Sequence, residues 1–258
     1  MAEPESESSL GDDLQQGLFS HLLELRSRLL KCVATVLLVL VALVPFANRL
    51  YTELAAPLVA RLPQGAHLIA TQVTSPFLTP LKLAFYAALF IGMPVILYQL
   101  WAFVSPGLYK HEKRLARPLL VAAMALFYLG CAFAYFLVLP AAFRFLTAVT
   151  PQGVEMMTDI THYLDFVMLM FFAFGLCFEV PVAVVILAAV GVVDLAKLRN
   201  ARRYAIVGAF VVSAVITPPD ITSMIMLAIP MCLLYELGLL AVRWLVPARV
   251  AQASDEVD

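Results

Sequence analysis

Four glutamates lie where a carboxylate could do chemistry. Glu179 lies in the middle of a long apolar run, and Glu236 lies in another. Glu24 lies in a leucine-rich segment beside bases, and Glu112 is the one acid in a short basic loop. An ionised group inside a membrane is costly, so such residues usually contact protein or water. These carboxylates could accept a cationic ligand, carry a proton or pair with another helix.

Motifs for other chemistry are absent from the sequence. There is no G-x-x-x-x-G-K-[ST] nucleotide loop, no H-E-x-x-H and no G-x-S-x-G. The four histidines are far apart in the sequence. The cysteines form no C-x-x-C pair and are therefore interpreted as apolar packing residues: Cys32, Cys131, Cys177 and Cys232. We therefore expect no enzyme activity, no metal and no cofactor.

The composition indicates a membrane protein. Of 258 residues, 63% are hydrophobic and only 14% are charged, and the mean hydropathy is +0.93. Globular domains are about half apolar and a quarter charged. Soluble enzymes, disordered proteins and nucleic-acid binders are thereby excluded, and no room remains for a sizeable soluble domain.

The apolar runs predict an all-α fold with six transmembrane helices. An acidic tail (1–17) and a second tail (247–258) flank a membrane domain (18–246). The fifth span is short for a bilayer. The expected spans are about 29–48, 77–104, 116–143, 162–190, 202–218 and 221–243.

Prolines and leucines add detail to these helices. A proline inside a helix removes a donor and clashes with the preceding turn, so kinks and a curved, open arrangement are expected. Leucines at helical spacing in residues 11–31 predict an amphipathic helix at the cytoplasmic interface. The segments 48–76 and 144–161 are expected to form a small outer cap. The prolines inside the runs are Pro45, Pro94, Pro140, Pro181 and Pro230.

The basic residues predict the orientation. Cytoplasmic loops carry an excess of Lys and Arg, and thirteen of the 17 bases fall on the side that holds both termini. These thirteen are Arg26, Arg28, Lys31, Lys110, Lys113, Arg114, Arg117, Lys197, Arg199, Arg202, Arg203, Arg243 and Arg249.

Each acid also has an alternative, structural interpretation. Glu24 could simply pair with Arg28 one turn away, and Glu112 could be a solvated loop charge. Glu179 could be protonated, could form a hydrogen bond within the kink at Pro181, or could contact a partner helix. Glu236 could snorkel or pair with Arg243.

Several motifs, in order along six spans, resemble the TatC family, the multispanning subunit of the twin-arginine protein translocase. The resemblance covers about residues 21–244. It rests on HLLELR (21–26), SPF (75–77) with Lys82, SPGLYKHEKR (105–114), FG (174–175), FEVP (178–181) and TPPD (217–220).

The resemblance implies a receptor and core scaffold. TatC proteins recognise the twin-arginine signal peptides of folded cargo, assemble with the single-span subunits TatA and TatB, and use the proton-motive force. The implied location is the bacterial inner membrane, with self-association in a receptor complex. The residues implied to bind the signal peptide are Glu24, Glu112, Arg26, Phe103, Leu108, Lys110, His111 and Arg114.

The resemblance also implies roles away from that site. Glu179 would meet a partner or the signal peptide within the membrane, and Thr217 and Met224 would mark the docking region for TatB or TatA. Met224 is apolar where some relatives are polar, and Gln72 is given no role. Roles that are mainly structural are implied for Pro57 and Pro94, and Asp220 is expected to cap the sixth span.

Two other classes compete with this interpretation. A six-span transporter could use Glu179 and Glu236 as proton or cation sites. However, transporters usually carry polar or interrupted segments in both halves, whereas here the mid-span acids lie only in the second half. An anchoring subunit without a transport role is the other alternative.

Overall fold

The computed structural model describes residues 5–59, 69–104, 116–150, 157–216 and 221–245, with side chains in α1 from Leu22 onward. Helices dominate this part of the chain, and no strand occurs in it. The helices are α1 (Glu5–Leu43), α2 (Ala47–Val59), α3 (Ser75–Val104), α4 (Ala116–Phe133), α5 (Leu139–Val149), α6 (Ile160–Phe178), α7 (Val180–Val190), α8 (Leu195–Asn200), α9 (Arg202–Ile216) and α10 (Ile221–Leu245).

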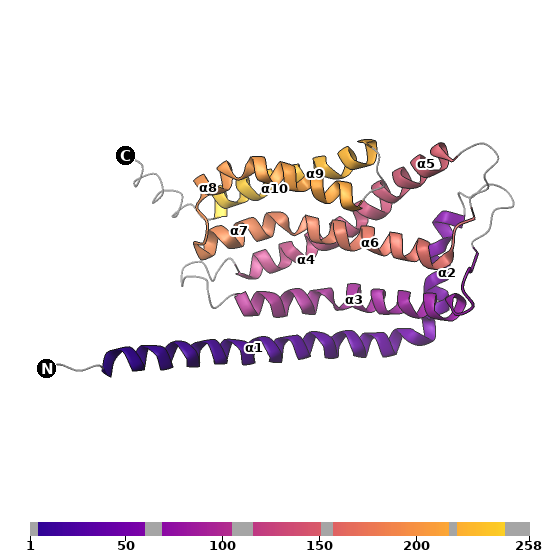
Figure 1. Ribbon diagram of the computed structural model, residues 1–258. Coiled ribbons are helices and arrows are strands. Elements are labelled where there is room, and N and C mark those ends of the chain that lie inside the picture. The colour runs from indigo at the N-terminus through magenta and orange to yellow at the C-terminus, as the bar shows by residue number, and fades with distance from the viewer. Residues whose placement is uncertain (1–4, 60–68, 105–115, 151–156, 217–220, 246–258) are drawn as a thin grey trace.

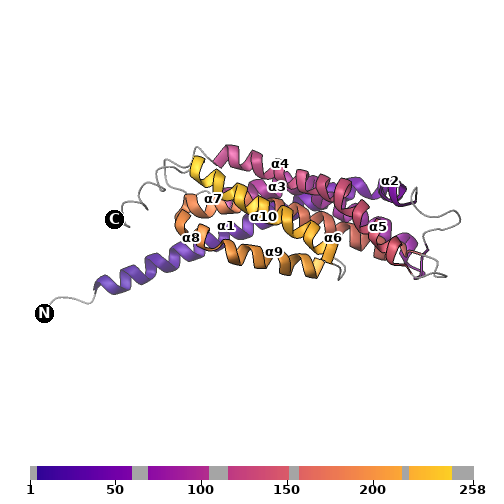
Figure 2. The same ribbon diagram turned by 90° about the horizontal axis from the view of Figure 1, so that it is seen from above.

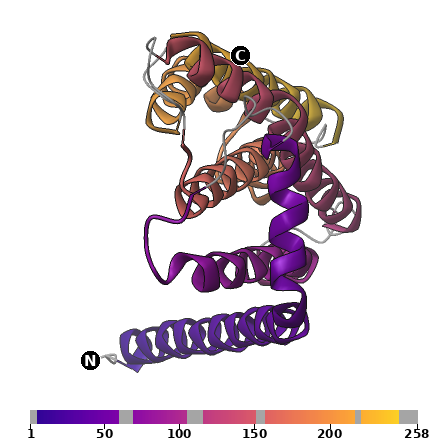
Figure 3. The same ribbon diagram turned by 90° about the vertical axis from the view of Figure 1, so that its right-hand side faces the viewer.

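The long helices lie side by side and form an open arc (Figures 1 and 3). α1 packs along α3, α4 packs on α6, and α10 packs on both α7 and α9. α1 and α9 therefore lie at the two edges, which agrees with the predicted curved arrangement. We call the end with α8 the α8 end, and the end with α2 the cap end. α1 begins and α10 ends at the α8 end (Figures 1 and 2).

Prolines interrupt the helices at three of the five expected places. A 3₁₀ turn at Pro45 ends α1, and a π-helical turn (Ala134–Val138) precedes Pro140 at the start of α5. Pro181 begins α7 after a one-residue break. At Pro94 and Pro230 the helix continues without a break. Long membrane helices tolerate a proline because neighbouring groups satisfy the freed carbonyls.

Five stretches are long and apolar enough to cross a membrane: residues 22–56, 75–103, 117–145, 160–190 and 227–245. α9 has only 15 residues, which gives a length of about 22 Å against a hydrocarbon core of about 30 Å. The described residues therefore establish a multi-pass helical protein. The span expected at α9, the fifth along the chain, and the exact span bounds stay predictions.

α1 differs from the predicted interfacial helix. It is one unbroken helix of 39 residues, about 58 Å long, and its first turns project beyond the other helices (Figure 1). A helix lying flat on the interface would need a bend before the span, and α1 has none. The reason is that the segment from Leu18 to Leu43 contains neither glycine nor proline.

Aromatic side chains fill the space between α3, α4 and α6. Phe127 and Phe174 are fully buried, and Phe90 stacks on Phe172 with ring centroids 4.8 Å apart. Glycines bring α4 and α6 close together, because a Cβ on Gly130 would lie 2.5 Å from the carbonyl oxygen of Phe174. α4 and α6 are therefore the central pair of the bundle.

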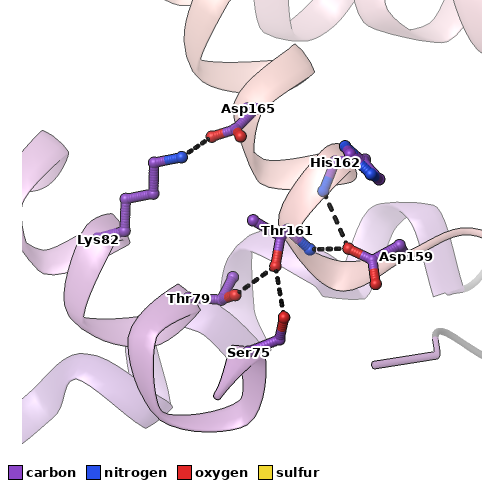
Figure 4. Close-up of polar contacts among 7 residues, drawn as sticks. All are labelled: Ser75, Thr79, Lys82, Asp159, Thr161, His162 and Asp165. Carbon is purple, nitrogen blue, oxygen red and sulfur yellow. Dashed lines mark hydrogen bonds and ion pairs between the residues drawn. The ribbon is translucent and has the colours of Figure 1, made fainter. Parts of the chain in front are cut away.

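Asp159 closes the cap end (Figure 4). Its Oδ1 accepts hydrogen bonds from the backbone N–H groups of Thr161 (2.8 Å) and His162 (3.2 Å), which caps α6. Its Oδ2 accepts hydrogen bonds from the N–H (2.9 Å) and hydroxyl (2.6 Å) of Thr71. Backbone hydrogen bonds between Ile69 and residues 158 and 160 complete the connection. The hydrogen bonds from Thr71, above all from its hydroxyl, hold the pKa of Asp159 well below its usual value.

Three further contacts join α3 to α6 at this end (Figure 4). The hydroxyls of Thr79 and Thr161 lie 2.8 Å apart, and Thr161 donates to Ser75 at 3.0 Å. Lys82 pairs with Asp165 just inside them. The predicted cap therefore contains α2. Hydrogen bonds and an ion pair connect residues 69–71 and the start of α3 to the start of α6.

Candidate functional site

An apolar groove of about 470 Å³ runs between α1 and α3. Its wall on α1 includes Leu25, Leu29 and Val33, and its wall on α3 includes Phe85 and Ile96. The groove is open because α1 packs mainly on α3 and makes no comparable contact with another long helix of the described residues. Such a groove can receive an apolar segment.

Polar groups gather where the groove approaches the α8 end. Glu24 Oε1 accepts two hydrogen bonds from Arg28, from Nη2 at 2.5 Å and from Nε at 3.0 Å. Arg28 Nη1 donates to Gln99 Oε1 at 3.3 Å and thereby connects α1 to α3. The predicted pairing of Glu24 with Arg28 is confirmed. No sequence pattern points to Gln99, because its partner lies 71 positions away.

Phe103 lines the same groove, one turn beyond Gln99 on α3. Of the predicted signal-peptide residues, Phe103 therefore lines the groove, and Glu24 binds Arg28, which lines it as well. Arg26 is exposed on α1. The other predicted residues lie outside the described part of the chain: Leu108, Lys110, His111, Glu112 and Arg114.

Glu179 occupies the break between α6 and α7. Its backbone N–H bonds to the carbonyls of Leu176 and Cys177, and its side chain makes no capping hydrogen bond. Oε1 is buried and has no hydrogen-bond partner among the described residues. The predicted hydrogen bond into the proline kink is therefore absent. A buried carboxylate oxygen without a partner is costly.

The sequence suggested that Glu236 could pair with Arg243, but the structure shows a different partner. Its carboxylate lies 2.7 Å from Nη2 of Arg202, on α9. Residues seven apart lie two turns apart on a helix, about 10 Å along its axis, whereas α9 begins beside Glu236. Sequence spacing alone cannot reveal this contact between helices.

The remaining predicted residues are scattered. Pro94 lies inside α3 and is half-buried, Met224 lies half-buried near the start of α10, and Gln72 is exposed in the turn before α3. Pro57 lies within α2. Thr217 and Asp220 fall outside the described residues, so the expected cap of α10 stays a prediction. No group of three or more His, Cys, Asp or Glu within the described ranges could hold a metal ion.

These helices and this groove define a multi-pass, all-helical membrane protein whose polar groups lie at the ends and breaks of its helices. A family model described as "Sec-independent protein translocase protein (TatC)" matches residues 20–230. This chain therefore belongs to the TatC family. It is a translocase component, which implies a complex with other Tat subunits.

Relatives and solved structures agree with this assignment. The Sec-independent protein translocase protein TatC of Azotobacter chroococcum is 58% identical over 226 residues, covering 88% of this chain and 89% of that protein. The TatC of Escherichia coli K12 is 53% identical over 231 residues, covering 90% of each. A crystal structure of the twin-arginine translocase receptor TatC matches with a TM-score of 0.75 at 36% identity, covering 88% of this chain and 99% of that one.

Proposed function

We propose that this protein is the signal-peptide receptor and core scaffold of a twin-arginine translocase that exports folded proteins. The observation that carries the proposal is a carboxylate, Glu24, bound to Arg28, which lines an apolar groove together with Phe103. A signal peptide has the same two parts, a basic motif followed by an apolar stretch.

Carboxylates suit the basic part of such a peptide. A guanidinium can donate two parallel hydrogen bonds to one carboxylate, which a lysine ammonium cannot reproduce. We assign one arginine of the motif to Glu24 and the other to Glu112. Because Glu24 already binds Arg28, an incoming arginine must share or replace that contact. The flanking residues Arg26, Lys110, His111 and Arg114 would shape this site.

The groove suits the apolar part. Its exposed walls are apolar side chains of α1 and α3, and covering them removes apolar surface from contact with polar groups near the membrane surface. Phe103, with Leu108 from the following loop, would contact the first apolar residues of the peptide.

Partner subunits would bind elsewhere. Glu179 has a buried oxygen without a partner, and a polar group of TatA, TatB or the signal peptide could satisfy it. Thr217 and Met224 would mark the docking region for TatB or TatA. Pro57, Pro94 and Asp220 would act structurally, and copies of the chain would associate in the receptor complex. The chain would carry no enzyme activity and no cofactor, and the proton-motive force would supply the energy.

The proposal includes six spans in the bacterial inner membrane with both termini in the cytoplasm. The distribution of Lys and Arg supports this orientation. The placement of the start of α1 and the end of α10 at the α8 end supports it as well (Figure 1). α9 would be the fifth span, and local thinning or snorkelling would match its short length to the bilayer.

Photo-crosslinking of a twin-arginine signal peptide to membranes containing the translocase tests the proposal. We expect the double variant Glu24→Gln, Glu112→Gln to lose crosslinking by at least about tenfold, since two charge-assisted contacts disappear. Glu53→Gln is the control, because Glu53 is an exposed acid of α2 paired only with Arg49. Undiminished crosslinking in the double variant would overturn the assignment.

Glu179→Gln separates partner binding from signal binding. We expect this variant to weaken co-purification of the single-span subunits while signal-peptide crosslinking stays near the wild-type level. The assigned role is wrong if crosslinking falls as far as in the double variant Glu24→Gln, Glu112→Gln. Uptake of a small solute by vesicles containing only this chain would instead support the transporter alternative.

A further inference from the structure

A second groove lies at the α8 end, on the opposite edge of the arc from the α1–α3 groove. It has a volume of about 530 Å³ and lies along α10 beside the first turn of α9. Buried Leu239 contributes to its lining. Leu233, Leu237 and Leu240 form its outward wall and are 59%, 55% and 47% exposed.

Two arginines and one glutamate also line this groove. Arg202 binds Glu236 through one guanidinium nitrogen, and both side chains are about half exposed. Arg243 is exposed and makes no hydrogen bond or ion pair with any described residue. The lining therefore has one positive charge in excess, and no residue in the described part of the chain neutralises the guanidinium of Arg243.

The length of α9 exposes this surface. α9 begins at Arg202, level with Glu236, while α10 continues for nine more residues, about 14 Å. α8 packs against α10 at the same level, where Tyr235 donates to the carbonyl of Leu198 at 2.7 Å. The last turns of α10 therefore extend past the start of α9 (Figure 2). Leu240 and Arg243 belong to these last turns.

We propose that this groove binds an anionic phospholipid, with its phosphate at Arg243 and Arg202 and an acyl chain along Leu240, Leu237 and Leu233. The order of the residues matches the molecule. The cations lie at the helix end, where lipid headgroups lie, and the leucines continue toward the middle of the span. A guanidinium binds a phosphate through two parallel hydrogen bonds, and basic pockets between helices at a membrane surface favour anionic headgroups.

Glu236 sets the strength of this preference. Its carboxylate holds Arg202 and cancels one of the two positive charges in the groove. A soluble anion would leave the three exposed leucines unused, whereas a phospholipid covers them and supplies the anion in the same molecule. The inference is independent of signal-peptide recognition, because no residue of the α1–α3 groove takes part.

Native mass spectrometry of the full chain, released from detergent with equal amounts of phosphatidylglycerol and phosphatidylcholine of identical chains, tests the proposal. We expect the wild type to retain phosphatidylglycerol preferentially. Arg243→Gln should reduce that preference by about fivefold, and Glu236→Gln should increase it, because the groove then has a second positive charge in excess.

Arg49→Gln is the matched control, because Arg49 is an exposed arginine of α2 at the cap end. It should leave the preference unchanged. A thermal melt of each variant verifies that the fold is retained, and all three substitutions are at exposed side chains. The proposal fails if the wild type shows no headgroup preference. It also fails if Arg243→Gln and Arg49→Gln have equal effects. A partner helix that occupied the groove in place of lipid would leave the wild type without a headgroup preference.

Discussion

The two most apolar stretches of this protein have nearly opposite environments. The most apolar 18-residue window within residues 160–190, which form α6 and α7, has a mean hydropathy of 2.4, and the window within residues 22–56, mostly α1, has one of 2.6. In the window from α6 and α7, 56% of the residues are buried inside the protein, but in the window from residues 22–56 only 6% are. α6 lies among α3, α4 and α10, whereas α1 lies at an edge and packs mainly on α3.

This difference shows that apolarity has two uses in a membrane helix. In α6 and α7 it supplies close packing between helices, and in α1 it supplies a surface for lipid or for a bound segment. Lipid tails are as apolar as leucine, so apolarity alone does not drive helices together in a membrane. Close approach at small residues does, and the central pair has such residues.

The largest effect on stability is expected where α4 crosses α6. In Gly130→Ala the new Cβ would lie 2.5 Å from the carbonyl oxygen and 2.9 Å from the carbonyl carbon of Phe174. Backbone atoms cannot yield as a flexible side chain can, so we expect a loss of about 1–3 kcal/mol. Thermal melting in detergent measures it.

Gly208→Ala is the matched control on the edge helix α9. A Cβ at Gly208 meets no atom within 4 Å, so we expect no loss and a gain of at most about 1 kcal/mol from helix propensity. Equal destabilisation by the two changes would contradict the distinction between centre and edge.

A smaller effect is expected at the cap end of α6. Asp159→Ala removes the helix cap and the hydrogen bonds to Thr71, so we expect the melting temperature to fall by several degrees. Asp194→Ala is the control, because Asp194 begins α8 without a capping hydrogen bond from its side chain. A fall as large in the control would show that the Asp159 hydrogen bonds add little stability.

The same carboxylate predicts a dependence on pH. The hydrogen bonds to Asp159 lower its pKa in the folded protein below the ordinary value of 3.8. Its contribution to stability is therefore fully present above about pH 5 and is lost as the pH falls below about 4. Melting curves of wild type and Asp159→Asn should differ by a constant amount near neutral pH and converge in acid. A difference that did not change with pH would exclude this linkage.

The smallest effect on stability is expected at the edge helix α1. Arg28→Gln removes the ion pair with Glu24 at the partly exposed rim of the α1–α3 groove. Such pairs contribute about 0.5 kcal/mol, so the melting temperature should barely change. Signal-peptide crosslinking should stay equal to wild type or rise, because Glu24 loses a competitor for the incoming arginine. A marked loss of stability would mean that α1 depends on this contact as the central helices depend on theirs.

Most of the membrane architecture could be predicted from the sequence, because hydropathy and proline placement act locally. The sequence located the apolar helices, the interruptions at Pro140 and Pro181, and the pairing of Glu24 with Arg28 one turn away. It failed where the partner is distant, as with Arg202 for Glu236 and Gln99 for Arg28. It also failed to predict that α1 continues unbroken from residue 5.

The sequence by itself therefore determined the class of protein, the apolar segments and the acids worth testing, because each follows from composition or from spacing within one helix. Only the tertiary structure decided which of two equally apolar helices is buried. It also decided that Phe103 shares a groove with Arg28, the partner of Glu24, and that a short α9 exposes the end of α10. These features depend on how closely two backbones approach, and a single glycine such as Gly130 can set that distance without changing the hydropathy of its helix.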